Sequence, residues 1–246
     1  MKIITYNIRH NTFLDIFPLW RSRYKRLIEY LSNNPKDVIG LQEITRKGKR
    51  YLSKRLKDYI VVGESRSSII LTNEYNPVLI NKRIKLLSYK TCSLSDNIDI
   101  RGTKVEGANF PRICTLVHIE ESNKKYLIVN THIDNSSPES KKRQLDILDK
   151  IISKEKDKNE YVILMGDFNM TLANDDLLEY SHNYNDPFKD NKNSSFVPNK
   201  DIRSLDHIFL DKKLKYKKEL IDNKTNDNGF ISDHYPLICE IDCLHK

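Results

Sequence analysis

The stretch that decides the fold is Tyr161-Val-Ile-Leu-Met-Gly-Asp-Phe-Asn-Met170. Its four apolar residues, Val162 to Met165, are typical of a strand that is buried on both faces. Glycine weakens a strand interior, so we expect this strand to break at Gly166. The polar residues that follow would then lie at the end of a core strand.

Asp167 and Asn169 stand two residues apart with Phe168 between them. Because alternate side chains of an extended backbone share a face, the carboxylate and the carboxamide should project together while Phe168 packs inward. Such a pair can accept a proton, hold a water molecule or bind a hard cation. The alternative is a polar turn after a core strand, so the choice depends on the rest of the chain.

The composition is that of a globular protein with a charged surface. Hydrophobic residues make up 38% of the 246 residues and charged residues 31%, which excludes a low-complexity or fibrous chain. The net charge of +8 permits a polyanionic partner such as nucleic acid or an anionic membrane surface. A chain of this length forms one or two domains, and no shift in composition marks a linker.

The cysteines and the apolar segments indicate a cytoplasmic protein. Cys92, Cys114, Cys239 and Cys243 form no CxxC pair, so we expect reduced thiols, with an oxidised pair of the last two as the alternative. The chain runs from Met1 directly into a strand, without the apolar segment of a secretion signal. No window approaches the ~20 apolar residues of a membrane span.

The pattern of apolar residues predicts a chain of alternating strands and helices. Helical spacing appears at residues 19–31, 47–57 and 138–153. Residues 91–110 and 173–201 lack periodicity and are predicted to be long loops, the first of them on the surface. We expect strands at residues 2–6, 37–43, 59–62, 68–71, 74–80, 84–87, 113–119, 126–130, 162–165, 203–210 and within 231–241.

Polar residues recur where these apolar strands begin or end. Each is unremarkable alone, because asparagine and charged residues commonly terminate strands. A charged aspartate such as Asp206, embedded among apolar neighbours, also needs a buried partner. The recurring groups are Asn7, Glu43, His132, Asp167 with Asn169, Asp206, and Asp233 with His234.

In these motifs the sequence resembles the endonuclease/exonuclease/phosphatase superfamily, within it a bacterial branch of hydrolases. The resemblance runs from residue 3 to residue 241. One departure lies at Gly102-Thr-Lys-Val-Glu106, where the aromatic residue usual in that branch is missing. The matching blocks are Thr5-Tyr-Asn7, Gly40-Leu-Gln-Glu43, Asn130-Thr-His132, Gly166-Asp-Phe-Asn169, Leu205-Asp-His-Ile-Phe209 and Ser232-Asp-His-Tyr-Pro-Leu237.

The resemblance implies the deoxyribonuclease I-like fold, an α/β four-layer sandwich. Two mostly antiparallel sheets would pack face to face, with helices outside and the active site at one edge. Because the resemblance leaves no room for a second unit, residues 1–246 are expected to form a single domain and a monomer. The chemistry implied is metal-assisted hydrolysis of a phosphate ester.

The resemblance also implies a cation site and a set of catalytic groups. Glu43, assisted by Asn7, would hold Mg²⁺ or Mn²⁺, and Asp233 would complete the shell or form a second site. Asp167 would orient or deprotonate the attacking water. Asn169 would hydrogen-bond a phosphate oxygen.

Two histidines would lie on opposite sides of the phosphate. His234 would contact it or act as acid or base, with Asp206 holding the imidazole and raising its pKa. His132 would be a second acid or charge stabiliser, oriented by Glu74. Arg112 would donate to phosphate oxygens. The remaining histidines are expected to be structural: His10, His118, His182, His207 and His245.

The substrate class is open at this point. Basic clusters at residues 46–57, 141–143 and 212–218 favour a nuclease, provided that they flank the catalytic edge. A small-molecule or lipid phosphodiesterase or phosphatase is the alternative within the superfamily, and it would have a narrow site walled by residues 91–110. A catalytically silent binding protein with the same fold is the third possibility.

Overall fold

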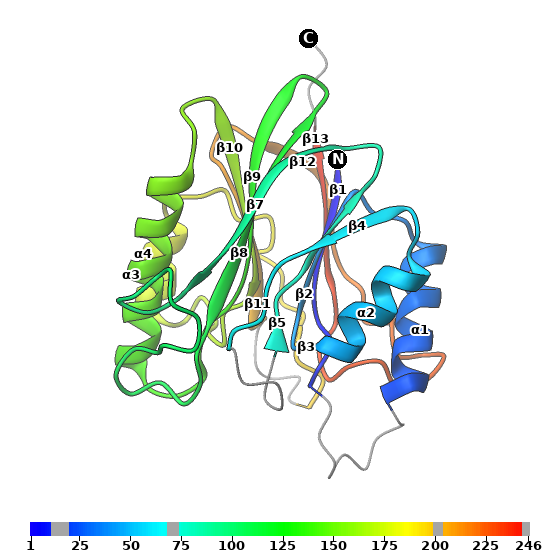
Figure 1. Cartoon of the computed structure of the whole chain (residues 1–246), viewed down its shortest axis with the longest axis horizontal. Coiled ribbons are helices and arrows are strands. Elements are labelled where there is room, and N and C mark those ends of the chain that lie inside the picture. Colours follow the sequence, from blue (N-terminus) through cyan, green and yellow to red (C-terminus); the bar gives the residue numbers. More distant parts are fainter. Residues whose placement is uncertain (11–19, 68–73, 199–203, 243–246) are drawn as a thin grey trace.

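The structure is a computed structural model that describes residues 1–10, 20–67, 74–198 and 204–242. Two β-sheets lie face to face, with α1 and α2 outside one sheet and α3 and α4 outside the other (Figure 1). The bounds of these helices are Trp20–Asn33, Arg46–Arg55, Pro138–Glu155 and Asp175–Ser181. This is the four-layer sandwich that the sequence predicted.

The first sheet has six strands in the order β12-β13-β1-β2-β6-β4. It brings the first and last strands of the described chain together, because β1 pairs antiparallel with β13 and parallel with β2. These strands are β1 (Lys2–Asn7), β2 (Val38–Gln42), β4 (Tyr59–Val62), β6 (Val78–Asn81), β12 (Lys215–Ile221) and β13 (Leu237–Asp242).

The second sheet has five strands in the order β11-β10-β9-β8-β7, and only the β9–β10 pair is parallel. A small two-stranded sheet, β3 (Ile44–Thr45) with β5 (Glu74–Tyr75), lies beside the two large ones. The five strands are β7 (Lys85–Ser93), β8 (Ile113–Glu121), β9 (Lys124–His132), β10 (Glu160–Asp167) and β11 (Asp206–Leu210).

Strand β10 is buried on both faces, as predicted. Val162 and Leu164 enter the core beneath α3, whereas Ile163 and Met165 enter the core between the two sheets. Its neighbour Phe168 is fully buried in the first of these cores. A third core joins α1 and α2 to the outer face of the six-stranded sheet. Strand β10 therefore anchors the residues that follow it.

A buried polar bridge fixes the two sheets against each other. Asn130 on β9 donates to the carbonyl oxygens of Leu41 (2.9 Å) and Pro77 (3.0 Å), and it accepts from Nε2 of Gln42 (2.6 Å). The approach is close because Gly40 has no side chain: a Cβ there would lie 2.9 Å from Oδ1 of Asn130. Satisfied buried networks of this kind specify one relative placement of the packed layers.

Several predicted boundaries were wrong. Strand β10 continues through Gly166 to Asp167, and the strand expected at 74–80 is split into β5 and β6. Helix α4 lies inside the expected loop 173–201, where Asn174 caps its N-terminus. The expected surface loop 91–110 begins with the last residues of β7, and Leu94, Val105 and Ala108 within it are buried in the core beneath α3. The strand expected at 68–71 lies outside the described residues.

Two other expectations concern the cysteines and membranes. Cys92, Cys114 and Cys239 are buried free thiols, while Cys243 lies outside the described residues. None of the helices in the described ranges has the length and apolarity needed to cross a bilayer.

Gly166 is the position at which a side chain should do most harm. Its φ of 152° lies where only glycine is at ease, and a Cβ would approach the backbone oxygen of Thr131 to 2.0 Å. We expect Gly166→Ala to lower the free energy of unfolding by about 3 kcal/mol or more.

The matched control is Gly102→Ala, which also has positive φ but whose Cβ would meet only Ser67 Oγ at 3.8 Å. We expect Gly102→Ala to lower the free energy of unfolding by about 1 kcal/mol. Urea denaturation of both variants measures the difference, and equal losses would contradict the role given to the Thr131 contact.

Candidate active site

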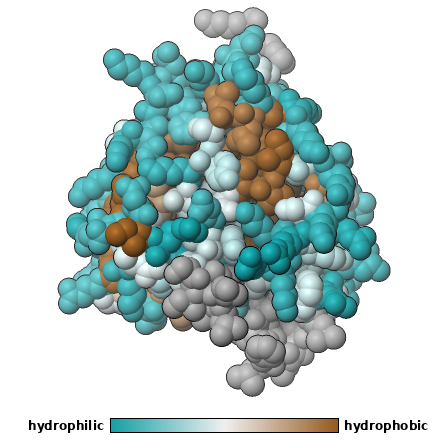
Figure 2. All heavy atoms as spheres, viewed as in Figure 1, coloured by the Kyte–Doolittle hydropathy of each residue, from teal (hydrophilic) through white to brown (hydrophobic). Residues whose placement is uncertain are grey.

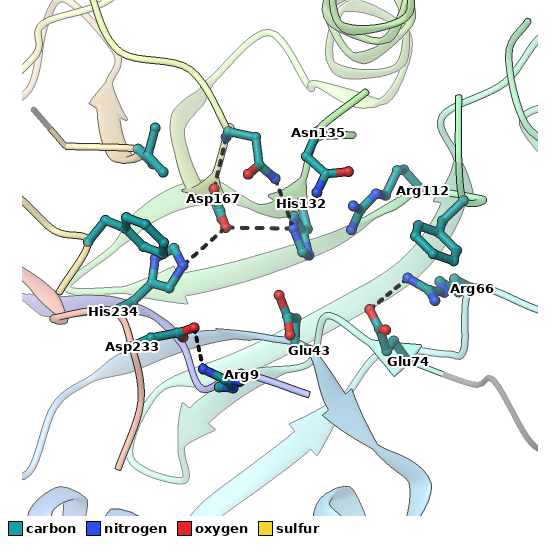
Figure 3. Close-up of a pocket in the computed structure, with 14 residues that line it drawn as sticks. Arg9, Glu43, Arg66, Glu74, Arg112, His132, Asn135, Asp167, Asp233 and His234 are labelled. Carbon is teal, nitrogen blue, oxygen red and sulfur yellow. Dashed lines mark hydrogen bonds and ion pairs between the residues drawn. The ribbon is translucent and has the colours of Figure 1, made fainter. Parts of the chain in front are cut away.

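The ends of β1, β9, β10 and β11 meet at one edge of the sandwich, where they border a cavity of about 340 Å³ (Figure 3). Most residues expected to act in the site line this cavity. Asn7 and Asp206 are buried directly behind it. The lining residues are Arg9, Glu43, Arg66, Glu74, Phe110, Arg112, His132, Asn135, Asp167, Asn169, Phe196, Leu205, Asp233 and His234.

Asn7 joins carboxylates that come from the two sheets. Its Nδ2 donates to Oε1 of Glu43 and to Oδ2 of Asp167, both at 2.9 Å. Its Oδ1 accepts from the backbone N–H of Arg9 at 2.9 Å. The amide of Asn7 thus holds the two carboxylates side by side.

Glu43 is held in an unusual backbone conformation, with φ of 61° directly after β2. Its second oxygen, Oε2, accepts from the backbone N–H of His10. Burial would raise the pKa of Glu43, but the hydrogen bonds from Asn7 and His10 outweigh it and lower the pKa. Glu43 is therefore an ionised carboxylate beside the cavity at neutral pH.

Asp206 has the buried partner that its position demanded. Its Oδ2 lies 2.8 Å from Nδ1 of His234 and accepts from Oγ of Ser195 at 2.6 Å. Phe196 packs edge-on against the His234 ring, with centroids 5.2 Å apart. These contacts fix the imidazole so that its Nε2 faces Asp167, 3.8 Å from Oδ2.

Asp167 lies between the two histidines, since its Oδ2 is also 3.6 Å from Nε2 of His132. Burial, and then the charge of Asp206, raise the pKa of Asp167 to about 7. Burial alone would lower the pKa of His234, but Asp206 and then Asp167 raise it to about 10. With these pKa values His234 is protonated on both nitrogens at neutral pH, whereas Asp167 is divided between its ionised and its protonated form.

His132 differs from the expectation in its partners. Its Nε2 lies 3.1 Å from Nδ2 of Asn169, whose amide also donates to the carbonyl oxygen of Ile133. Burial, and then Arg112 and Arg66, hold the pKa of His132 well below its usual range. Its buried Nδ1 meets no hydrogen-bond acceptor among the described residues.

The prediction that Glu74 orients His132 was wrong for this structure. Glu74 instead accepts from Nη1 of Arg66 at 2.7 Å, and its other oxygen lies 3.4 Å from Nδ1 of His10. A guanidinium is always charged and binds a carboxylate more strongly than a neutral imidazole does. His10, expected to be structural, thereby lies at the rim of the site.

Three arginines border the cavity, and each has a carboxylate partner. Nη1 of Arg9 lies 3.0 Å from Oδ2 of Asp233, and Nε of Arg112 lies 3.3 Å from Oδ1 of Asp134. The third is Arg66 with Glu74. Of these arginines, only Arg112 was predicted to have a role. Arg9 could have been predicted, because it follows Asn7 by two residues. No sequence motif marks Arg66, or Ser195 beside Asp206.

The charges around the cavity fit a bound cation, because carboxylates outnumber the cationic side chains. The carboxylates that line the cavity offer oxygen donors, which suit Mg²⁺ or Mn²⁺. Asp167, Asp206 and His234 also lie within 4.8 Å of one another, but His234 would have to lose a proton before it could ligate. The cationic groups are Arg9, Arg66, Arg112 and His234, and the carboxylates are Glu43, Glu74, Asp134, Asp167, Asp206 and Asp233.

Three of the histidines that were expected to be structural have structural positions. His118 pairs with Glu160 at 2.8 Å, and Nε2 of the buried His207 lies 2.9 Å from the carbonyl oxygen of Met170. His182 caps the C-terminus of α4. His245 lies outside the described residues.

The two active-site histidines should titrate far apart. In metal-free protein we expect His132 to stay neutral and His234 to titrate near pH 10. Because the pKa of His234 is raised on folding, its pairing with Asp206 stabilises the fold fully below about pH 6.5 and this contribution is lost as pH rises through about 10. The stability difference between wild type and Asp206→Asn should therefore shrink from neutral pH to pH 10.

Imidazole ¹⁵N shifts and urea denaturation at the two pH values measure these effects. In Asp206→Asn the pKa of His234 should fall. Ordinary, equal pKa values for the two histidines in wild type would refute the assignment.

Comparisons with known proteins support the fold and identify the family. The chain is 26% identical to the uncharacterized protein L388 of Acanthamoeba polyphaga mimivirus, over 97% of this chain and 98% of the viral protein. Its fold is similar to that of an endonuclease/exonuclease/phosphatase from Bacteroides vulgatus, with a TM-score of 0.88, 23% identity and 98% coverage of both chains. It is also similar to the mannosyl-6-phosphatase Bt3783 of Bacteroides thetaiotaomicron, with a TM-score of 0.83, 20% identity, and coverage of 98% of this chain and 99% of that one. The profile of the Endonuclease/Exonuclease/phosphatase family matches residues 4–234, and the chain therefore belongs to this family.

Proposed function

We propose that this protein is a divalent-metal-dependent phosphoesterase whose reaction takes place in the cavity between Glu43 and His132. The observation that carries the proposal is the placement of Asp167, bonded to Asn7 at 2.9 Å and flanked by two histidines with displaced pKa values. Members of this family are hydrolases of phosphoesters. An intact set of ionisable groups also argues against a silent binding protein.

The family typically uses divalent metals, and the residues present fit such an ion. Glu43 would hold it, and the metal would neutralise phosphate charge and lower the pKa of a bound water. Asn7 would position Glu43, to which its amide donates, and its Oδ1, which accepts one hydrogen bond from the backbone of Arg9, keeps a second lone pair for the ion. Asp233 is paired with Arg9, so it would bind the ion only after this ion pair had broken.

Different side chains would accept the proton of the water and donate hydrogen bonds to the phosphate. Asp167, with its pKa near neutrality, would orient the attacking water and accept its proton. His234 would donate a hydrogen bond from Nε2 to a phosphate oxygen, while Asp206 keeps the ring oriented and charged. Neutral His132 and Asn169 would contact the opposite side of the phosphoryl group, and Arg112 would donate to its oxygens.

The placement of the basic residues favours a compact substrate. Strand β12 pairs with β13 so that Lys215 lies opposite Asp242 and Ile221 opposite Leu237. Because His234 precedes Leu237, the cluster at 212–218 lies at the edge away from the site. In the second cluster, Lys142 and Arg143 are engaged by aspartates. We therefore favour a small phosphate ester, which is also the substrate class in the name of the similar mannosyl-6-phosphatase.

Hydrolysis of polynucleotides is the second candidate. It is supported by the net charge of +8 and by Lys141, whose Nζ donates to the carbonyl oxygen of Asn169 beside the cavity. Assays with single- and double-stranded DNA, RNA, bis-p-nitrophenyl phosphate and sugar phosphates, each with Mg²⁺, Mn²⁺ or EDTA, separate the two candidates. The cytoplasmic location and the monomeric state stay predictions.

Removing the charge of Asp167 should abolish turnover without unfolding the protein. We expect Asp167→Asn to lower kcat at least about 10²-fold, because the attacking water loses its proton acceptor. The exposed Asp146→Asn on α3 serves as the matched control and should keep wild-type activity. Steady-state kinetics and thermal denaturation provide the readouts, and a fully active Asp167→Asn would mean that another group activates the water.

Glu43→Gln should act on the metal dependence. The variant keeps the shape of the side chain but loses its charge, so we expect the Mg²⁺ concentration for half-maximal activity to rise about tenfold or more. Glu64→Gln, which alters an exposed glutamate paired with Arg101, should leave the titration unchanged. A Glu43→Gln titration that superimposes on wild type would remove Glu43 from the proposed cation site.

A further inference from the structure

The cavity has a second end, of which the proposed chemistry uses only Arg112. Arg66 and Arg112 lie on the side of His132 that faces away from His234 (Figure 3), and Phe110 lines the same cavity. The guanidinium carbons of Arg66 and Arg112 lie 5.1 and 6.0 Å from the centroid of the Phe110 ring. The aromatic ring thus holds two cations at one end of the site.

Arg66 is buried although the mechanism gives it no task. Its side chain is only 9% exposed, and burying a guanidinium is costly unless its donors are used. Glu74 accepts from Nη1 at 2.7 Å. Because Arg66 also lines the cavity, its guanidinium can donate to a ligand bound there.

Phe110 is also unusual for its position. It is 48% exposed at the cavity, whereas most large apolar side chains in the described ranges are buried. Phe110 and Arg66 come from different segments of the chain, and their contact restricts where the guanidinium can lie. A planar guanidinium fork matches the geometry of phosphate oxygens.

We propose that Arg66, oriented by Glu74 and Phe110, binds a second phosphoryl group of a compact substrate. Arg112, which lies between His132 and Arg66 in Figure 3, would contact the groups at both ends. This inference rests on the proposed function, because the first phosphoryl group is the one that is hydrolysed. It specifies a substrate with two phosphoryl groups a few bonds apart, in contrast to a neutral sugar monophosphate.

Binding of non-hydrolysable probes tests the proposal without requiring turnover. We would compare 1,3-propanediphosphonate with propylphosphonate by isothermal titration calorimetry at one fixed free Mg²⁺ concentration. Wild type should bind the diphosphonate about tenfold more tightly, as expected for one added charge-assisted contact. Arg66→Gln should lose this preference while its affinity for propylphosphonate stays unchanged.

Two further variants test whether misfolding or a general change of charge explains the result. Phe110→Leu introduces no buried unpaired charge and should reduce the preference for the diphosphonate several-fold. The double variant Arg66→Gln/Glu74→Gln leaves no carboxylate without its partner and should behave as Arg66→Gln does. Arg101→Gln is the matched control, since Arg101 pairs with Glu64 outside the cavity, and it should keep the wild-type preference.

Equal binding of the two probes by wild type, or an undiminished preference in both Arg66 variants, would overturn the proposal. So would a propylphosphonate analogue with a terminal carboxylate that binds as tightly as the diphosphonate, because any anion would then be accepted. Failure of the proposed function is a separate outcome: it would appear as absent hydrolysis in wild type while the difference between the probes persists.

Discussion

One side-chain amide holds the site together. Asn7 donates from a single nitrogen to Glu43, at the end of its own sheet, and to Asp167, at the end of the facing sheet. Two buried carboxylates repel each other, so their proximity needs a donor between them. The amide supplies that donor without adding a charge. The relative placement of the sheets, set deeper in the core by Asn130 and Gln42, keeps the three side chains within reach.

Because carboxylates outnumber arginines at the cavity, the arginines do not create a positive field there unless a cation is also bound. Each guanidinium at the rim is matched by a carboxylate, and Glu43 remains ionised without one. A phosphate ester would therefore meet a field that is close to neutral or negative until a cation arrives. Behind the site lies a hydrophobic shell in which the ring centroids of Phe168 and Phe209 are 5.3 Å apart. This shell keeps the charged side chains at fixed positions.

An apolar run marks β10 and helical spacing marks α3, whereas the two facing sheets and the convergence of polar residues at one edge were predicted from the resemblance of the strand-end motifs to the family. The helix α4 was missed, since its seven residues are too few for a clear period among polar neighbours. The partner of Glu74 was also missed: it depends on the competition between Arg66 and His132 in three dimensions. Ser195, which donates to Asp206, lies in a segment without any periodic signal.

The pairing of β1 with β13 has a consequence for how the protein is made. Asn7 is separated in the sequence from Asp233 and His234 by more than two hundred residues. The reactive centre therefore cannot assemble until residues 233 and 234 have been synthesised. A product that stops before them would also lack β13, whose Leu237, Cys239 and Ile241 belong to the core between the sheets, so the interior of the fold and its reactive centre are completed together.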